Sequence, residues 1–127
     1  MPMPRIYLLS HLSLALIWLY HGLVPKLLVG HAQEVRMNDA LIPFVERDLA
    51  LLAVGIGEAL FAIVYLLLYR HAWPNYLSIF FGLATIPPLL LVAPDLFGHA
   101  FNPFSTNLGL ASLALINLWS HPNRRPL

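Results

Sequence analysis

The chain has 127 residues, of which 59% are hydrophobic and 10% are charged, whereas soluble domains have about 25% charged residues. A soluble fold of this size could not bury so much apolar surface, so the composition excludes a water-soluble globular domain and indicates a lipid environment. The net charge of +1 excludes the basic surface that nucleic-acid binding needs. The absence of cysteine excludes disulfides and thiolate ligands, so any redox role needs an external cofactor or partner.

Four windows of roughly 20 mostly apolar residues are long enough to cross a hydrocarbon core about 30 Å thick. In chain order they cover about 6–29, 49–68, 76–92 and 104–119. The first window contains one formal charge, Lys26, the second contains Glu58, and the last two contain none. The sequence therefore predicts an all-α protein, an integral membrane four-helix bundle that forms a single domain over residues 1–127.

The connection between the first two windows, residues 30–48, mixes charges with apolar side chains, and we expect an interfacial helix there. The excess of basic residues on cytoplasmic loops predicts orientation, and it favours both termini in the cytoplasm of a multi-pass cell-membrane protein. This orientation places Arg5, Arg70, Arg124 and Arg125 inside and Lys26, Arg36 and Arg47 outside.

Two ionisable side chains lie at similar depth in the first two predicted spans. Glu58 follows Asp48 by ten residues, roughly 15 Å of helix, and His21 precedes Gly30 by nine residues. Charges in hydrocarbon cost about 2.5–3.5 kcal/mol each, so they usually face the bundle interior and pair. We therefore expect Glu58 to be the catalytic residue of an intramembrane site, with His21 and Lys26 as ligand-binding residues beside it.

Simpler interpretations stay open for these three side chains. Glu58 and His21 can be purely structural and hydrogen-bond between helices. Lys26 can extend its amine to the membrane surface, because it lies near the outer end of the first span. Pro25 removes the backbone donor that would bond the carbonyl of His21, and Pro87 and Pro88 interrupt the third span in the same way.

The second span has a face that we expect to point inward. Tyr65 follows Glu58 by seven residues and shares its helical face, so it is a further candidate ligand-binding residue. Gly55, Gly57 and Ala59 are small enough to let another helix approach closely.

A metal site is an alternative in the outer loops. His31 and Glu34 are one helical turn apart in the first of these loops, and Asp95 and His99 are spaced by four in the second. Such pairs also arise by chance in polar loops, and a di-iron bundle would need more carboxylates within its helices than Glu58 alone. The primary prediction is therefore no metal.

Over nearly its whole length and all four spans the chain resembles the DoxX-like family, whose members are four-helix membrane bundles, and three of the spans carry motifs of that family. The first span resembles the family's apolar run that ends in Gly-x-x-Pro-Lys, and the fourth span resembles the family's helix that begins with Asn-Pro-x-x-x-Asn. The second span resembles the family's Gly-x-x-Glu-x-x-x-Gly helix, except that Ala62 stands where the later glycine often is. The matching residues are Gly22, Pro25 and Lys26, then Gly55 and Glu58, and then Asn102, Pro103 and Asn107. The resemblance adds Asn107 to the candidate ligand-binding residues.

The family takes its name from the small subunit of a thiosulfate:quinone oxidoreductase, so the resemblance implies a membrane subunit that binds quinone. In this hypothesis Glu58, His21 and Lys26 bind the polar head of the quinone and handle its protons. A soluble or membrane partner subunit supplies the electrons. The alternative is a non-enzymatic scaffold, lipid-binding protein or small transporter. Both hypotheses have the lipid bilayer as a partner and allow a homo-oligomer, and neither involves nucleic acid.

Overall fold

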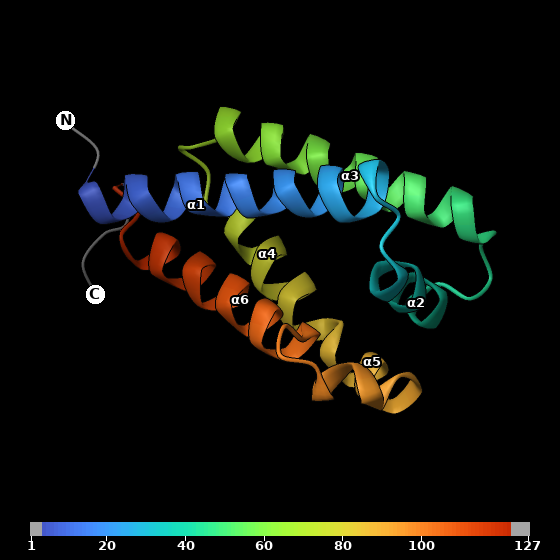
Figure 1. Ribbon diagram of the computed structural model, residues 1–127. Helices are drawn as coiled ribbons and strands as arrows, with labels where there is room; N and C mark the ends of the chain where they lie inside the picture. The colour runs from blue at the N-terminus through green and yellow to red at the C-terminus, as the bar shows by residue number, and fades with distance from the viewer. Residues whose placement is uncertain (1–3, 123–127) are drawn as a thin grey trace.

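The computed structural model of the protein describes residues 4–122, and every element in this range is helical (Figure 1). The long helices, in chain order, are α1 (Arg5–His21), α3 (Arg47–Leu67), α4 (Trp73–Ala84) and α6 (Pro103–Trp119). Shorter elements connect them: the π-helix η1 (Gly22–Leu28), α2 (Ala32–Leu41), α5 (Ile86–Val92) and the 3₁₀ helix η2 (Pro94–Gly98).

Side-chain caps fix where several helices begin. The carboxylate of Glu46 accepts hydrogen bonds from the backbone N–H groups of Asp48 and Leu49 at 3.0 and 2.9 Å, and α3 starts there. The Asn102 side chain accepts from the N–H of Ser105 at 2.9 Å at the start of α6. These bonds satisfy donors that the first turn of a helix leaves without partners.

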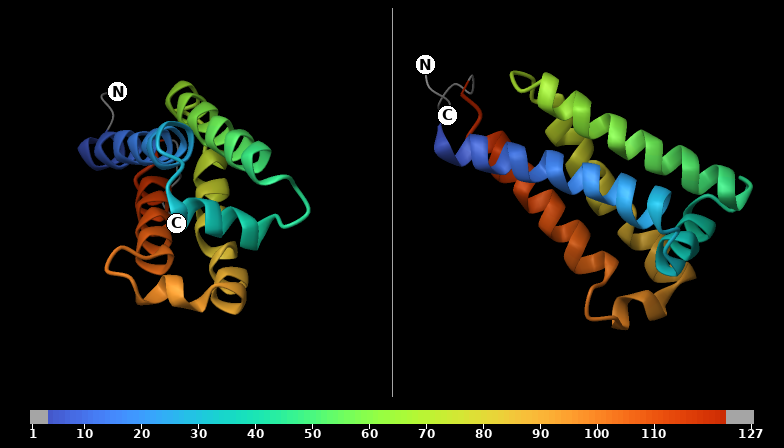
Figure 2. Two further views of the ribbon diagram at one scale, coloured as in Figure 1. Left: turned by 45° about the vertical axis from the view of Figure 1, so that its right-hand side comes forward. Right: turned by 45° about the horizontal axis from the view of Figure 1, so that its top comes forward.

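The helices form one bundle in which α1 packs against both α3 and α6, while α4 packs against α6. Figure 1 and both views of Figure 2 show α1 and α3 running side by side, with α2 and α5 at the end of the bundle opposite the described chain ends. The π-helix η1 continues α1 to that end, and α2 lies there beside η1 and α3.

The core lies where α1, α3 and α6 meet. Leu14, Trp18, Ala62 and Ala114 are buried there, and the indole N–H of Trp18 donates to the Ser78 hydroxyl of α4 at 3.0 Å. Large apolar side chains also cover the outside of the helices. Within residues 4–122, three helical segments are long and apolar enough to cross a membrane, and they are Arg5–Leu28, Arg47–Leu67 and Trp73–Val92.

This outer apolar surface is what lipid would cover, and it confirms the predicted all-α, membrane-bundle fold. The fourth long helix, α6, has 17 residues and completes the bundle. The expected helix between the first two spans is present as α2, although its ten residues start and end inside the predicted range.

Close helix contact was predicted for Gly55, Gly57 and Ala59, and the prediction is wrong for Gly57. A Cβ built on Gly57 would meet no atom within 4 Å, because this residue faces away from the other helices. At Gly55 a Cβ would come within 2.8 Å of Leu27. The glycine that α3 approaches most closely is Gly22 of η1, where a Cβ would lie 2.7 Å from the backbone nitrogen of Ala59.

Proline shapes two of the membrane segments. Pro25 lies inside η1, which has the wider π-helical turn in place of the α-helical pattern that a proline interrupts. Pro87 and Pro88 lie in the first turn of α5, and the long segment Trp73–Val92 is divided into α4 and α5 at Thr85. The Thr85 hydroxyl donates to the carbonyl of Phe81 at 2.9 Å.

Candidate functional site

Lys26 lies at the centre of a buried ion cluster, which we call the Lys26 cluster: Lys26, Glu34 and Glu58. The ammonium Nζ is 2.9 Å from Oε2 of Glu34 and 2.9 Å from Oε2 of Glu58. It also donates to the carbonyl of His21 at 3.4 Å, the acceptor that Pro25 leaves without its α-helical donor. Three oxygens therefore lie within 3.4 Å of one ammonium group.

Each member of the cluster comes from a different element. The π-helical turn of η1 presents Lys26, the middle of α3 presents Glu58, and the packing of α2 against η1 and α3 brings Glu34 onto them. The close contact of Gly22 with α3 brings η1 and α3 near enough for the Lys26 and Glu58 side chains to meet.

Burial makes these interactions energetically important. The side chains of Lys26, Glu34 and Glu58 are 6%, 11% and 19% exposed. Removing one partner of a buried pair costs about 3–5 kcal/mol, because the other charge then stays buried without compensation. Glu58 is the most accessible member, so it is the side chain that a ligand can reach first.

The inner face of α2 carries a second polar side chain. Asn38 is one turn beyond Glu34, about 6 Å along the helix, and is 6% exposed. Its Nδ2 donor makes no hydrogen bond to any residue in the described part of the chain. A buried amide donor without a partner costs about 1–3 kcal/mol, so this position suits the oxygen of a ligand or a water molecule.

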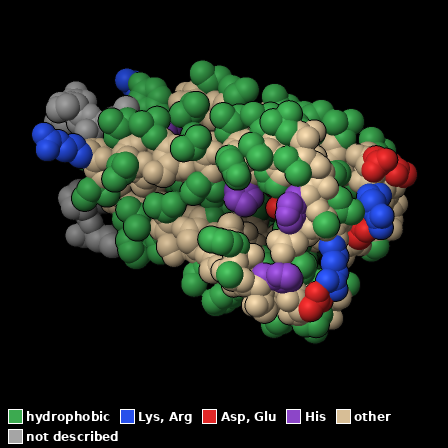
Figure 3. Space-filling model, in the orientation of Figure 1, with side chains coloured by type: hydrophobic (Ala, Val, Ile, Leu, Met, Phe, Trp, Pro, Cys, Tyr) green, Lys and Arg blue, Asp and Glu red, His purple; other side chains and the backbone are tan. Residues whose placement is uncertain are grey.

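His21 lies beside the cluster, within electrostatic reach of both Lys26 and Glu34. Its ring is in edge-to-face contact with Tyr20, with the ring centroids 6.2 Å apart. Figure 3 shows histidine side chains gathered around a hollow on the face formed by α1 and α2, with an acidic side chain visible inside it. Ionisable groups are thus open to the outside at this face of the bundle.

The structure does not bring Tyr65 or Asn107 to the Lys26 cluster. Tyr65 is fully buried and donates to the Asn75 side chain of α4, in contact with the His11 ring, whose centroid is 4.7 Å from its own. Asn107 donates to the hydroxyl of Thr85 at 2.8 Å, where it supports the break between α4 and α5. Both bonds connect neighbouring helices.

The residues of the alternative metal site are engaged separately. The imidazole of His31 accepts from the N–H of Gln33 at 3.3 Å, and Glu34 pairs with Lys26. The Arg36 guanidinium hydrogen-bonds Asp95 and holds the pKa of that carboxyl below its usual range. No group of three potential metal ligands lies together among residues 4–122.

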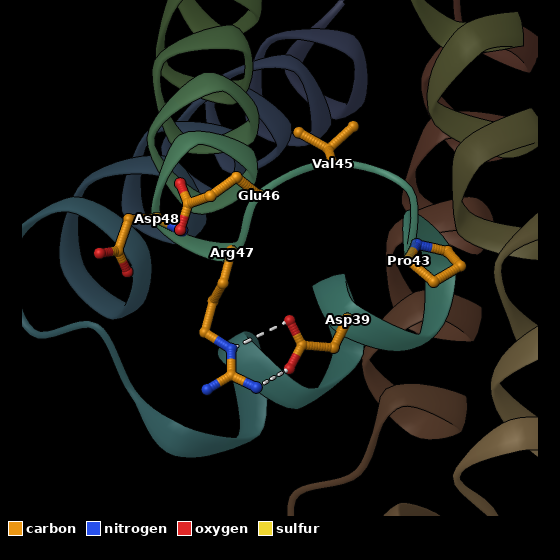
Figure 4. Close-up of a pocket in the computed structure, with 6 residues that line it drawn as sticks. All are labelled: Asp39, Pro43, Val45, Glu46, Arg47 and Asp48. Carbon is orange, nitrogen blue, oxygen red and sulfur yellow. Dashed lines mark hydrogen bonds and ion pairs between the residues drawn. The ribbon is translucent and has the colours of Figure 1, made fainter.

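A surface hollow of about 630 Å³ opens beside the loop that connects α2 to α3 (Figure 4). The Arg47 guanidinium donates to Asp39 across this hollow at 2.6 Å, and both side chains are exposed to solvent. Its lining is Asp39, Pro43, Val45, Glu46, Arg47 and Asp48, which includes no member of the Lys26 cluster. We therefore assign the candidate site to the cluster and not to this hollow.

Sequence reasoning expected Lys26 and Glu58 in one site but considered Glu34 only as a metal ligand. The signal for Glu34 was the spacing of Glu34 and Asn38, which places two polar side chains on one face of a short helix. Such a face usually points to water, and only the packing of α2 over the bundle shows that it points inward.

Comparison with known proteins identifies the family. The family model described as the DoxX-like family matches residues 15–122, which is most of the chain and includes the last two turns of α1 and all of α3, α4 and α6. No curated protein and no solved structure matched the chain. With its apolar helices and buried polar cluster, this small membrane protein therefore belongs to the DoxX-like family.

Proposed function

We propose that this protein is the membrane subunit of a quinone-linked oxidoreductase and that it binds the head of a quinone beside Glu58. The observation that carries the proposal is the Lys26 cluster, a charged group buried among apolar helices with one carboxylate still accessible. A structural ion pair needs one acid and one base, whereas this cluster has a second acid and lies beside His21.

The chemistry of the site suits a quinone. Oxidation of a hydroquinone releases two electrons and two protons, so the site needs a proton acceptor near the ring oxygens. Glu58 supplies a carboxylate, and the free Nδ2 of Asn38 supplies a donor for a quinone carbonyl. The exposed apolar faces of α1 and α3 let an isoprenoid tail remain in the lipid.

The electrons must travel to or from another protein, because the chain has no cysteine for an iron–sulfur centre. In this proposal the other protein is a soluble or membrane-bound partner subunit. The chain lies in the cell membrane with both termini in the cytoplasm, following the bias of basic residues.

A second function is favoured by one feature of the same cluster. The Lys26 ammonium contacts oxygens of η1's preceding turn, α2 and α3, so the cluster can act purely to hold these elements together. The protein would then be a scaffold, a lipid-binding protein or a small transporter whose bound molecules are phospholipids.

Mass spectrometry of organic extracts separates these functions. Protein purified gently from membranes should contain quinone in near-stoichiometric amount, and Glu58→Gln should lose most of it, because an amide keeps the size of the side chain but cannot accept the proton. The matched control is Asp48→Asn, the same chemical change at an exposed position in the first turn of α3. Phospholipid without quinone in the wild-type extract would favour the scaffold function.

A further inference from the structure

The buried cluster contains more acid than base. Lys26 contributes one positive charge, Glu34 and Glu58 contribute two negative charges, and a neutral His21 contributes none. Left in this state, the cluster would place an uncompensated negative charge inside the bundle. An ionised group without compensation in a low-dielectric interior is costly enough that proteins usually neutralise it.

No other base in the surrounding elements can compensate this charge. Arg36 of α2 is already paired with Asp95 of η2, and Arg47 of α3 is paired with Asp39 of α2. Asp48, the remaining acid of α3, lies in the exposed first turn. The other histidines near this end, both exposed, are His31 and His99.

We propose that Glu34 and Glu58 together hold one proton, which makes the Lys26 cluster a proton-binding site inside the membrane bundle. Each carboxylate places its Oε2 atom 2.9 Å from Nζ of Lys26, and the proton resides on one of the two carboxylates. With the proton bound, one carboxylate balances the ammonium and the other is a neutral carboxylic acid. The cluster then carries no net charge.

The arrangement also lets the proton move within the cluster. Glu34 lies on α2, whose Arg36 and Asp39 side chains form ion pairs at the exposed end of the bundle. Glu58 lies near the middle of α3, and the two carboxylates contact the same ammonium. Because both carboxylates lie against one ammonium, the proton can move between them, and both side chains keep some exposure, 11% for Glu34 and 19% for Glu58, through which it can leave the cluster.

This inference depends on the count of buried charges and does not depend on quinone binding. Infrared spectroscopy of the full-length protein in lipid nanodiscs tests it, because a protonated carboxylic acid has a C=O stretching band that ionised carboxylates lack. We expect the wild-type protein at neutral pH to show one such band, and we expect the band to shift when H₂O is replaced by D₂O.

Variants test the balance of charges. Glu58→Gln and Glu34→Gln should each abolish the band, because the remaining carboxylate then pairs with Lys26 and needs no proton. Lys26→Met should roughly double it, because both carboxylates then become neutral. The control Asp48→Asn, at an exposed site, should leave the band unchanged.

Two results would overturn the proposal. A wild-type protein without an acid band would mean that a cation or a protonated His21 balances the cluster. A band that persists in Glu34→Gln would mean that Glu58 is protonated by burial alone, without the shared charge balance. Both measurements use proteins that retain the ion pair of Lys26 with one carboxylate, and neither requires a bound ligand or an activity.

Discussion

At the scale of single residues, close contacts of small side chains explain how the charged side chains can meet. Gly22 lets η1 lie directly on the backbone of α3, next to the turn that presents Lys26. The sequence predicted that Glu58 would meet His21 or Lys26, from the depth that Glu58 shares with His21 and from the cost of an isolated charge. It identified Gly55 as a contact but missed Gly22, because a glycine's partner depends on how the helices are rotated.

We expect Gly22→Ala to destabilise the protein by about 1–3 kcal/mol, as overpacking of a tight contact does. The added Cβ would lie 2.6 Å from the carbonyl oxygen of Gly55 and 2.7 Å from the nitrogen of Ala59, and these backbone atoms cannot move without separating the helices. Unfolding of detergent-solubilised protein by heat or denaturant measures the effect.

Gly57→Ala is the matched control in the same region of the bundle. Because its Cβ meets no atom within 4 Å, the change should be neutral or should stabilise α3 by up to about 1 kcal/mol through helix propensity. Equal stability of the two variants would contradict the close packing of η1 on α3.

At the scale of elements, ion pairs at several positions hold the short helix α2 in place. Glu34 pairs with Lys26 in the interior, Arg36 pairs with Asp95 of η2, and Asp39 pairs with Arg47. Sequence reasoning could predict a helix in this segment from its mixed composition. It could not predict the partners, because they lie on three other elements whose positions depend on the whole bundle.

The pairing of Arg36 with Asp95 should make the docking of α2 depend on pH. Hydrogen bonds from Arg36 lower the pKa of Asp95 from its ordinary value of 3.8, so the pair contributes stability above that value and loses it as the pH falls through the lower folded pKa. A spin label at Ala40 should therefore be restrained at neutral pH and become more mobile well below pH 3.8.

Arg36→Gln provides the comparison for this measurement. The variant should show a more mobile label at neutral pH already and a smaller further change on acidification, because the titrating pair is gone. Identical titration curves for the wild type and the variant would show that another contact controls the mobility of α2.

At the scale of the whole molecule, hydropathy predicted the fold because the membrane imposes a length and a composition on each span. The break at Thr85 was foreseeable from Pro87 and Pro88, but the hydrogen bond that Asn107 makes to Thr85 was not, because it joins α4 and α6 across the bundle. Likewise, the shared helical face of Tyr65 and Glu58 did not reveal that these side chains contact different partners.

The proposed orientation can be tested with single cysteines, since the protein has none of its own. Pro43 lies in the α2–α3 loop and His71 in the α3–α4 turn, at opposite ends of α3, and both are exposed. A cysteine at Pro43 should react with a membrane-impermeant thiol reagent in whole cells, whereas a cysteine at His71 should react only after the membrane is opened. The reverse pattern would place both termini outside.

The central claim, a quinone head bound at the Lys26 cluster, is tested most directly by photoaffinity labelling of the membrane-embedded protein with an azidoquinone. The proposed function predicts that competition by unlabelled quinone protects peptides containing η1, the inner face of α2 and the middle of α3, and that Glu58→Gln loses this protected labelling. Labelling that is spread over the lipid-facing surfaces and unaffected by competing quinone would contradict it.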